Sequence, residues 1–135
     1  MHAAEQLIRT LNQAWPAADL ERVAACYHPD ALLLPPDAGD PIVGRDAIRS
    51  TYRDFLDTAE LVQFNILSVA RFEFSNTETQ GAQSAIHLRF EVDYRLDGDL
   101  YRDTGLETYW VDATPQILWR HQVIDSSKQI EDDAT

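Results

Sequence analysis

The spacing of apolar residues divides the chain into a helical part followed by a part made of strands. Between residues 3 and 60 apolar side chains recur every three or four positions, and beyond residue 60 they alternate with polar ones. A helix turns once in 3.6 residues, whereas a strand points successive side chains to opposite faces. The sequence therefore predicts an α+β domain in which the helices precede an antiparallel sheet.

Three helices are predicted in the first part of the chain. The first covers residues 3–15 and ends at Pro16, because a proline ring cannot continue a helix. The second begins after Asp19, a good N-cap residue, and carries apolar side chains up to Tyr27. The third begins near Arg45.

The remainder of this first part is predicted to be irregular apart from one strand. His28-Pro29-Asp30 predicts a turn, and the apolar residues 31–34 predict a short buried strand. Residues 35–44, PPDAGDPIVG, are rich in Pro, Gly and Asp and are expected to form a loop.

The alternating pattern of the second part predicts an antiparallel meander. Asp97-Gly98 is a hairpin turn signal between two of its strands. Residues 126–135 are polar and acidic, and we expect them to fray. The predicted strands cover residues 61–74, 84–95, 101–111 and 116–124.

These elements predict a single domain over residues 1–125, shaped as a cone. A curved antiparallel sheet of four or five strands would pack against three N-terminal helices and leave the mouth of the cone open. A ligand would bind in that apolar interior. The chain length of 135 residues suits one domain with a core large enough for a modest pocket.

The net charge and the cysteine content of the chain limit which partners it is expected to bind and in which cellular compartment it is expected to work. The formal net charge is −12, so phosphate backbones and anionic lipid surfaces are repelled, and neither nucleic acid nor membrane is an expected partner. The lone Cys26 excludes an intramolecular disulfide and a cysteine-rich zinc site. No apolar run reaches bilayer length and the chain starts without a secretory leader, so we expect a cytoplasmic protein.

Two motifs resemble a known family. Residues 19–31 follow the pattern D-x7-Y-x2-D-A, and residues 44–52 follow G-R-D-x-I-x3-Y. With the meander that ends in ILWRHQVID, the chain resembles the nuclear transport factor 2-like superfamily over about residues 5–125. Its SnoaL-like and ketosteroid-isomerase-like small proteins are the most similar. The resemblance implies the same cone fold, whereas the chemistry varies widely within this fold.

The resemblance also allows catalytic positions to be compared. The general-base aspartate of ketosteroid isomerases falls at Pro35, and their oxyanion-hole tyrosine falls at Leu11. Neither residue can transfer a proton or donate a side-chain hydrogen bond, which argues against steroid isomerisation. Their second oxyanion-hole group falls near Glu107.

Limonene-epoxide-hydrolase-like members offer a further comparison, because they need an arginine and two aspartates around one water. Arg89 with Glu91 or Asp93 has suitable spacing along a strand. The aspartate of the last strand is replaced by Gln122 or His121. The match to this chemistry is therefore weak.

Two residues are candidates for acid–base catalysis. Histidine is a common proton relay in enzymes, so His121 would relay a proton if it faced the interior. The apolar residues around it, Ile117, Trp119 and Val123, favour that orientation, although the opposite register places Arg120 and Gln122 inside instead. Glu107 would act as an acid or as an oxyanion partner, because an apolar pocket raises the pKa of a carboxylic acid.

Aromatic residues are the candidates for binding a ligand in the cone. Tyr27 and Tyr52 would anchor a ligand oxygen through their hydroxyl groups. No phosphate-binding loop, zinc motif or metal-ligand spacing occurs, so neither metal nor cofactor is expected. The full set of predicted ligand-binding residues is Trp15, Tyr27, Tyr52, Phe55, Phe90, Tyr109 and Trp119.

The sequence thus predicts a protein that binds a small, mainly apolar, oxygen-bearing molecule, with isomerisation, cyclisation or dehydration as the reactions to consider. A non-catalytic carrier or sensor and a dimerisation domain remain as alternatives. The resemblance implies a homodimer formed through the outer face of the sheet. The last predicted strand carries large apolar residues at positions that point to either face, which burial of both faces would explain.

Overall fold

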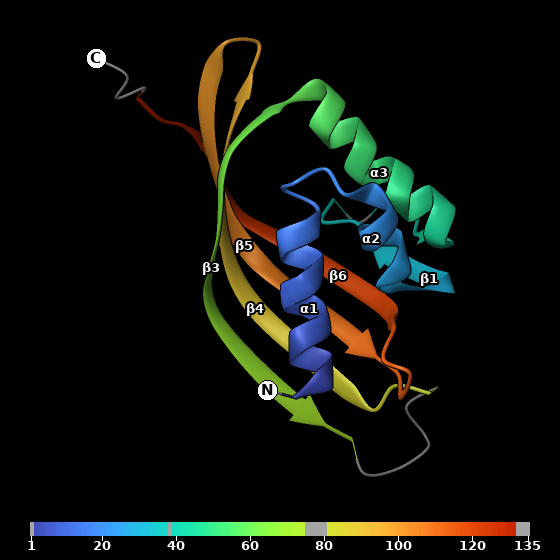
Figure 1. Cartoon of the computed structure of the whole chain (residues 1–135). Coiled ribbons are helices and arrows are strands. Elements are labelled where there is room, and N and C mark those ends of the chain that lie inside the picture. The colour runs from blue at the N-terminus through green and yellow to red at the C-terminus, as the bar shows by residue number, and fades with distance from the viewer. Residues whose placement is uncertain (1, 38, 75–80, 132–135) are drawn as a thin grey trace.

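The computed structural model describes residues 2–37, 39–74 and 81–131. A strongly curved sheet wraps around the helices, which lie on its concave side (Figure 1). In chain order the elements are α1 (Ala3–Ala14), α2 (Leu20–Ala25), β1 (Tyr27–Leu34), β2 (Ile42–Val43), α3 (Arg45–Thr58), β3 (Glu60–Glu73), β4 (Ser84–Leu96), β5 (Asp99–Val111) and β6 (Ile117–Gln129).

The sheet of the described residues has the strand order β2-β1-β6-β5-β4-β3. All neighbouring strands are antiparallel except β1 and β6, which are parallel. The sheet does not close, and β2 and β3 are its two edge strands. This is the predicted α+β cone.

The helices begin and end largely where their sequence signals place them. His2 caps α1 by accepting a hydrogen bond from the backbone N–H of Ala4, and Asp19 caps α2 by accepting one from Arg22. One face of α1 turns Ile8 and Leu11 into the core, where both are fully buried. Among the described residues, no helix is long and apolar enough to cross a membrane.

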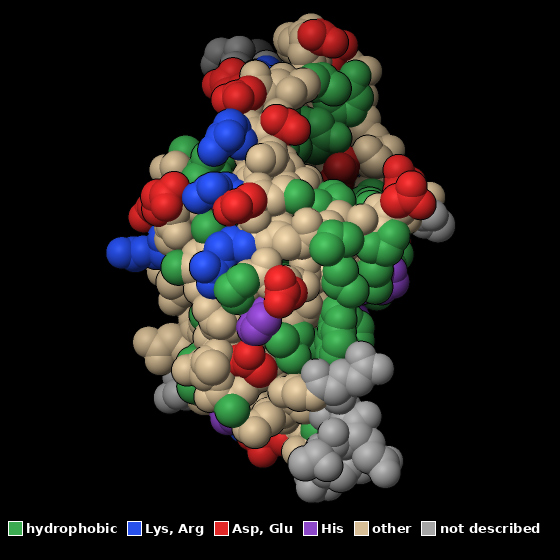
Figure 2. Space-filling view, turned by 90° about the vertical axis from the view of Figure 1, so that its right-hand side faces the viewer, with side chains coloured by type: hydrophobic (Ala, Val, Ile, Leu, Met, Phe, Trp, Pro, Cys, Tyr) green, Lys and Arg blue, Asp and Glu red, His purple; other side chains and the backbone are tan. Residues whose placement is uncertain are grey.

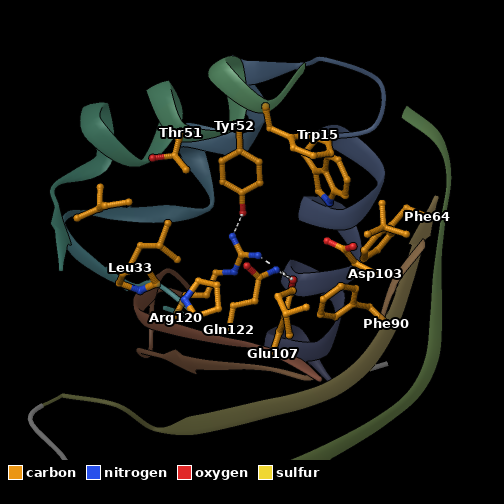
Figure 3. Close-up of a pocket in the computed structure, with 16 residues that line it drawn as sticks. Trp15, Leu33, Thr51, Tyr52, Phe64, Phe90, Asp103, Glu107, Arg120 and Gln122 are labelled. Carbon is orange, nitrogen blue, oxygen red and sulfur yellow. Dashed lines mark hydrogen bonds and ion pairs between the residues drawn. The ribbon is translucent and has the colours of Figure 1, made fainter. Parts of the chain in front are cut away.

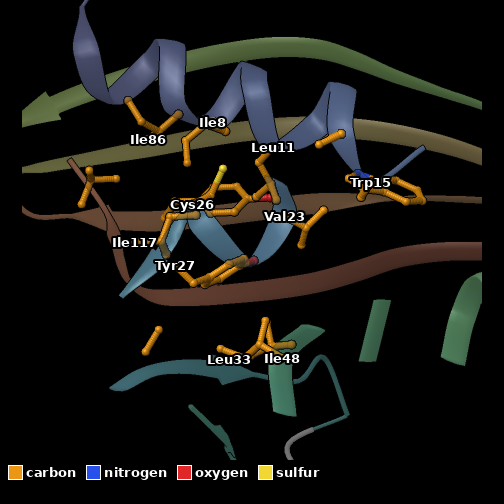
Figure 4. Close-up of a cluster of buried hydrophobic side chains, with 14 of the residues drawn as sticks. Ile8, Leu11, Trp15, Val23, Cys26, Tyr27, Leu33, Ile48, Ile86 and Ile117 are labelled. Carbon is orange, nitrogen blue, oxygen red and sulfur yellow. The ribbon is translucent and has the colours of Figure 1, made fainter. Parts of the chain in front are cut away.

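Buried hydrophobic side chains, most of them aliphatic, pack between the helices and the concave side of the sheet (Figure 4). Ile8 and Leu11 of α1 meet Val23 of α2 and strand residues such as Ile86 and Ile117, all at 1 % exposure or less. Burying a side chain of this size contributes roughly 1.5–3 kcal/mol. This packing holds the helices against the sheet.

The segment around Tyr27 differs from the prediction. The residues expected to end a helix and form a turn are instead the start of β1, which begins at Tyr27. Tyr27 pairs with Ile117 of β6, and its carbonyl accepts two hydrogen bonds from the Arg45 guanidinium, at 2.9 and 2.7 Å. These contacts are distant in sequence, so local propensity could not reveal them. The loop predicted over residues 35–44 likewise contains β2, which pairs with β1.

The last strand is longer than predicted. β6 continues to Gln129, so the expectation that the tail frays from residue 126 is wrong for the first four of its residues. Ser126, Ser127 and Lys128 pair with β5, and the Ser127 hydroxyl donates to Asp103 at 2.6 Å. The polar composition of this stretch reflects an exposed end of the sheet. Residues 132–135 lie outside the described residues.

Candidate functional site

A cavity of about 340 Å³ lies on the concave side of the sheet, between α3 and strands β3 to β6 (Figure 3). In Figure 2, hydrophobic side chains border a hollow in which an acidic side chain is recessed. Side chains come to the cavity from the C-terminal cap of α1, from α3, from the loop after β1 and from all six described strands. The lining residues are Trp15, Leu33, Pro35, Pro36, Ile42, Thr51, Tyr52, Phe55, Phe64, Phe90, Val92, Asp103, Glu107, Arg120, Gln122 and Ile124.

Aromatic rings form much of the wall. The Trp15 ring lies 5.0 Å from that of Phe64, 6.0 Å from that of Phe55 and 6.3 Å from that of Tyr52, measured between centroids. Phe64 in turn stacks on Phe90 at 6.0 Å. The Trp15 indole N–H donates to Asn12 at 3.0 Å, which fixes the ring at the end of α1.

A buried ion pair forms the polar floor of the cavity. The Arg120 guanidinium donates to Glu107 Oε1 at 2.7 Å and to the Tyr52 hydroxyl at 2.7 Å (Figure 3). Gln122 also donates to Glu107 Oε1, at 2.9 Å. Glu107 is 2 % and Arg120 is 8 % exposed. A charge buried this deeply requires such partners, because an unpaired one is very costly.

Two further tyrosines extend this network beneath the cavity. The Tyr109 hydroxyl donates to Glu107 Oε2, and the hydroxyls of Tyr27 and Tyr52 share a hydrogen bond of 2.7 Å. Burial raises the pKa of all three tyrosine hydroxyls, although the Arg120 charge opposes the effect. The three tyrosines are therefore neutral hydrogen-bonding groups at physiological pH.

Arg120 remains charged in this environment. Burial disfavours its cationic form, but the Glu107 carboxylate and the three tyrosine hydroxyls outweigh that effect and raise its pKa. Its guanidinium carbon also lies 5.4 Å from the centre of the Tyr52 ring and 5.5 Å from that of Tyr109. The Nε of Arg120 is buried and has no hydrogen-bond acceptor within the described part of the chain.

A second carboxylate lines the cavity at some distance from this floor. Asp103 and Glu107 are both on the concave side of β5, four residues apart, which corresponds to about 13 Å along a strand. Asp103 Oδ1 accepts hydrogen bonds from Tyr94 at 3.1 Å and Ser127 at 2.6 Å. Asp103 is only half-buried, unlike Glu107.

Most of the residues predicted from sequence lie at this site. Glu107 and four of the predicted aromatic residues, Trp15, Tyr52, Phe55 and Phe90, line the cavity. Tyr27 and Tyr109 do not line it, but they belong to the hydrogen-bond network beneath it. The structure therefore brings together residues from the C-terminal cap of α1 and from α3, β1, β4 and β5.

The prediction that His121 and Trp119 face the interior of the cone is wrong. Their side chains lie on the convex face, where the Trp119 ring packs against Trp110 at 6.4 Å. The reason is a bulge in β6: Trp110 pairs with Trp119 and Val111 pairs with Ile117, so Leu118 is an extra residue. Ile117 faces the core as predicted, but the extra residue reverses the alternation after it.

Sequence reasoning missed four polar residues of the cavity, Thr51, Asp103, Arg120 and Gln122. The same bulge turns Arg120 and Gln122 inward, in the register that the apolar pattern did not favour. Asp103 was not singled out, although it alternates with Gly105 and Glu107 on the predicted strand. An arginine inside an otherwise apolar strand segment is the signal that would have identified Arg120.

Other positions considered from sequence are also placed by the structure. Pro35 lines the cavity. The position that was compared with the general base of ketosteroid isomerases is therefore at the site, but its side chain has no acid–base group. Arg89 is on the convex face, paired with the exposed Asp125 at 3.4 Å. It does not line the cavity. Within residues 2–37, 39–74 and 81–131, no group of three or more His, Cys, Asp or Glu is placed to hold a metal.

Comparison with known proteins identifies the family. The family model of the SnoaL-like domain matches residues 8–117. The chain belongs to the SnoaL-like family. No curated protein sequence matches it.

Solved structures share the fold at low sequence identity. A ketosteroid isomerase-like protein from Erwinia carotovora atroseptica is 19% identical, with a TM-score of 0.68 over 90% of this chain and 93% of that one. A limonene-epoxide-hydrolase-like epoxide hydrolase of M. tuberculosis is 14% identical, with a TM-score of 0.70 over 90% and 82%. A protein of ketosteroid isomerase-like fold from Catenulispora acidiphila, in complex with trimethylamine, is 10% identical, with a TM-score of 0.67 over 86% and 82%. At these identities the likeness shows the fold alone.

Proposed function

We propose that this SnoaL-like protein binds a small, mainly apolar, oxygen-bearing molecule in the cavity between its helices and its sheet. The observation that carries the proposal is the cavity itself: about 340 Å³, walled by aromatic and aliphatic side chains, with hydrogen-bonding groups at its floor. Concave apolar sites with a few convergent polar groups are typical of ligand pockets. The amide of Gln122 has further hydrogen-bonding capacity beyond its bond to Glu107, which suits a ligand oxygen.

Titration with 3,3-dimethylbutan-1-ol, a compact apolar alcohol, tests this proposal. Binding is followed by the NMR signal of the Trp15 indole N–H, assigned by its loss in Trp15→Phe. We expect a saturable shift that disappears in Ile124→Trp, because Ile124 lines the cavity and the larger ring fills it. Val123→Trp places the same ring on the adjacent, 40 % exposed convex position and should leave binding intact. A signal that never moves contradicts the proposal.

Glu107 favours acid–base turnover as a second candidate function. Its carboxylate lines the cavity, and Gln122 and Arg120 beside it carry N–H donors that would stabilise an oxyanion formed next to it. Glu107 would remove a proton from the carbon beside a carbonyl group and later return it. A protein without this activity would be a carrier for the same ligand.

Hydrogen–deuterium exchange on cyclohexanone in D₂O measures that step directly. We expect the wild type to accelerate exchange beside the carbonyl, Glu107→Gln to abolish the acceleration, and Glu91→Gln on the convex face to retain it. Gln122→Leu, which leaves the Glu107–Arg120 pair intact, should slow exchange even if Glu107→Gln does not fold. If the wild type exchanges no faster than buffer, turnover is rejected and the carrier function stands.

We further propose that the partner of this chain is a second copy, docked through the convex face. One row across the sheet there carries Phe72, Ala85, Trp110 and Trp119. Phe72 is 56 % exposed, and contiguous exposed apolar patches mark interaction surfaces. Sedimentation velocity should show a dimer that Trp119→Glu dissociates and Trp119→Phe preserves, whereas a monomeric wild type contradicts the proposal.

A further inference from the structure

The charges of the cavity are not balanced. Its charged lining residues are Asp103, Glu107 and Arg120, which gives a formal charge of minus one. Glu107 and Arg120 neutralise each other through a hydrogen bond of 2.7 Å. Within the described part of the chain, no lysine or arginine forms an ion pair with Asp103. The uncompensated charge therefore belongs to Asp103.

The two hydrogen bonds to Asp103 orient its carboxylate without neutralising it. Tyr94 and Ser127 both donate to Oδ1, which leaves Oδ2 with capacity to accept from another donor. Figure 3 shows the carboxylate pointing into the cavity, close to Trp15, Phe64 and Phe90. A carboxylate held in this way is a ready acceptor for a cationic donor.

The aromatic rings around Asp103 suit a cation as well. The ring of Trp15 is inclined by 74° to that of Phe64 and by 75° to that of Phe55, so the rings surround the space from several sides. Aromatic faces carry a negative electrostatic potential and attract ammonium groups, and tryptophan does so most strongly. An uncharged ligand would use the same rings but would leave the charge of the Asp103 carboxylate uncompensated.

We propose that the molecule bound in this cavity carries a positively charged amine, held by the Asp103 carboxylate and by the faces of Trp15, Phe64 and Phe90. The inference rests on the proposed binding function and specifies the class of ligand. Arg120 lies at the far end of the cavity, where it is paired with Glu107, and Glu107 is about 13 Å from Asp103 along β5. The amine therefore occupies the Asp103 end, and the oxygen-bearing part of the ligand faces Gln122.

A matched pair of probes separates the charge from the shape. Choline and 3,3-dimethylbutan-1-ol are isosteric alcohols that differ by a quaternary nitrogen in place of a carbon. Both are titrated against the Trp15 indole N–H signal. We expect choline to bind about tenfold more tightly than its neutral isostere, which is the range expected for a partly desolvated cation between aromatic faces.

Two variants assign this preference to Asp103. Asp103→Asn keeps an oxygen to accept from Tyr94 and Ser127 but removes the charge, so the preference for choline should fall at least threefold while the neutral probe binds unchanged. Asp99→Asn removes the same charge from an exposed position on the same strand and should keep the preference. Trp15→Tyr weakens the attraction of the cation to the aromatic rings and should reduce choline binding more than binding of the neutral probe. Because this variant lacks the indole N–H signal, binding is followed by the NMR signals of choline and of the alcohol themselves.

Each outcome decides between the two proposals. If the neutral isostere binds as tightly as choline, or if Asp103→Asn keeps the preference, the cationic ligand is rejected while the binding function stands. If neither probe moves the Trp15 signal at saturating concentrations, the binding function is contradicted, and the cationic ligand with it.

Discussion

The two faces of the sheet hold oppositely charged side chains in different ways. On the concave face, Arg120 and Glu107 are 2.7 Å apart with side chains 10 % and 3 % exposed. On the convex face, Arg89 and Asp125 are 3.4 Å apart with side chains 49 % and 40 % exposed. An arginine–carboxylate pair is therefore part of a buried hydrogen-bond network on one face and of a solvent-exposed surface on the other. Burial, rather than residue type, decides what such a pair contributes.

The largest effect should follow from breaking the concave pair. Arg120→Met leaves the Glu107 carboxylate buried without its cation, so we expect the free energy of unfolding to fall by about 3–5 kcal/mol. Arg89→Met removes an exposed pair and should change it by less than about 1 kcal/mol. Urea denaturation of both variants measures the difference. Equal losses would show that the concave pair is hydrated in solution.

A similar contrast is expected at the backbone of β5. A Cβ added at Gly105, on the concave face, would lie 2.1 Å from the carbonyl oxygen of Val123 and 3.0 Å from the Phe90 ring. The strands must separate to accommodate it, so Gly105→Ala should destabilise the fold by about 1–3 kcal/mol. Thr104→Ala, on the convex face, loses one exposed hydrogen bond to Asp125 and should cost about 1 kcal/mol or less. Thermal unfolding of both variants tests this, and a Gly105→Ala variant as stable as wild type would contradict the close approach.

Alkaline pH should reveal the buried tyrosines of the concave face. Burial raises the pKa of Tyr27, Tyr52 and Tyr109 above that of an unfolded tyrosine, near 10. Above that pH the unfolded chain releases protons that the folded chain retains, so stability is fully present below pH 10 and falls as the pH rises. Each such group contributes a slope of up to about 1.4 kcal/mol per pH unit.

Denaturation midpoints between pH 8 and pH 11 measure this loss. Burial also raises the pKa of the Cys26 thiol to about 11, with Arg22 opposing the effect, so the measurement is made in a Cys26→Ala background. Tyr52→Phe should then make the decline less steep. A decline of the same slope in both proteins would show that Tyr52 ionises as readily in the folded chain as in the unfolded one.

The sequence was sufficient for the fold because periodicity and turn signals are local. The change of period near residue 60 and the Asp97-Gly98 turn placed α3 and the hairpin strands within a few residues. Five cavity residues were also predicted from the sequence. Glu107 was identified by its position in the family resemblance, and the others, such as Trp15, as aromatic residues of the predicted cone.

The facing of β6 could not be found in this way. It depends on one extra residue, Leu118, opposite the Trp110–Val111 step of β5. Both faces of β6 carry large side chains, so either register satisfies the hydrophobic pattern. The inward register is distinguished by the hydrogen bonds of Arg120 to Glu107 and Tyr52, which are 13 and 68 positions away in sequence. Such partners are visible only once the chain has folded.

The smallest expected effect concerns two neighbours on β6 that face opposite sides. Gln122 lines the cavity and donates to Glu107 at 2.9 Å, whereas His121 pairs across the strands with Thr108 on the convex face. Gln122→Leu removes a polar partner for the ligand oxygen, so binding of 3,3-dimethylbutan-1-ol should weaken by about threefold to tenfold, the range for one neutral hydrogen bond. His121→Ala should leave the affinity within twofold of wild type.

These two substitutions test the facing of β6 in solution, because a shift of one residue would exchange their effects. If His121→Ala weakened binding and Gln122→Leu did not, the bulge at Leu118 would be absent and His121 would face the cavity. Circular dichroism and denaturation of both variants serve as the control, because each substitution also removes contacts within the sheet and can change the stability of the fold. A change in affinity without a change in stability then assigns the effect to the cavity.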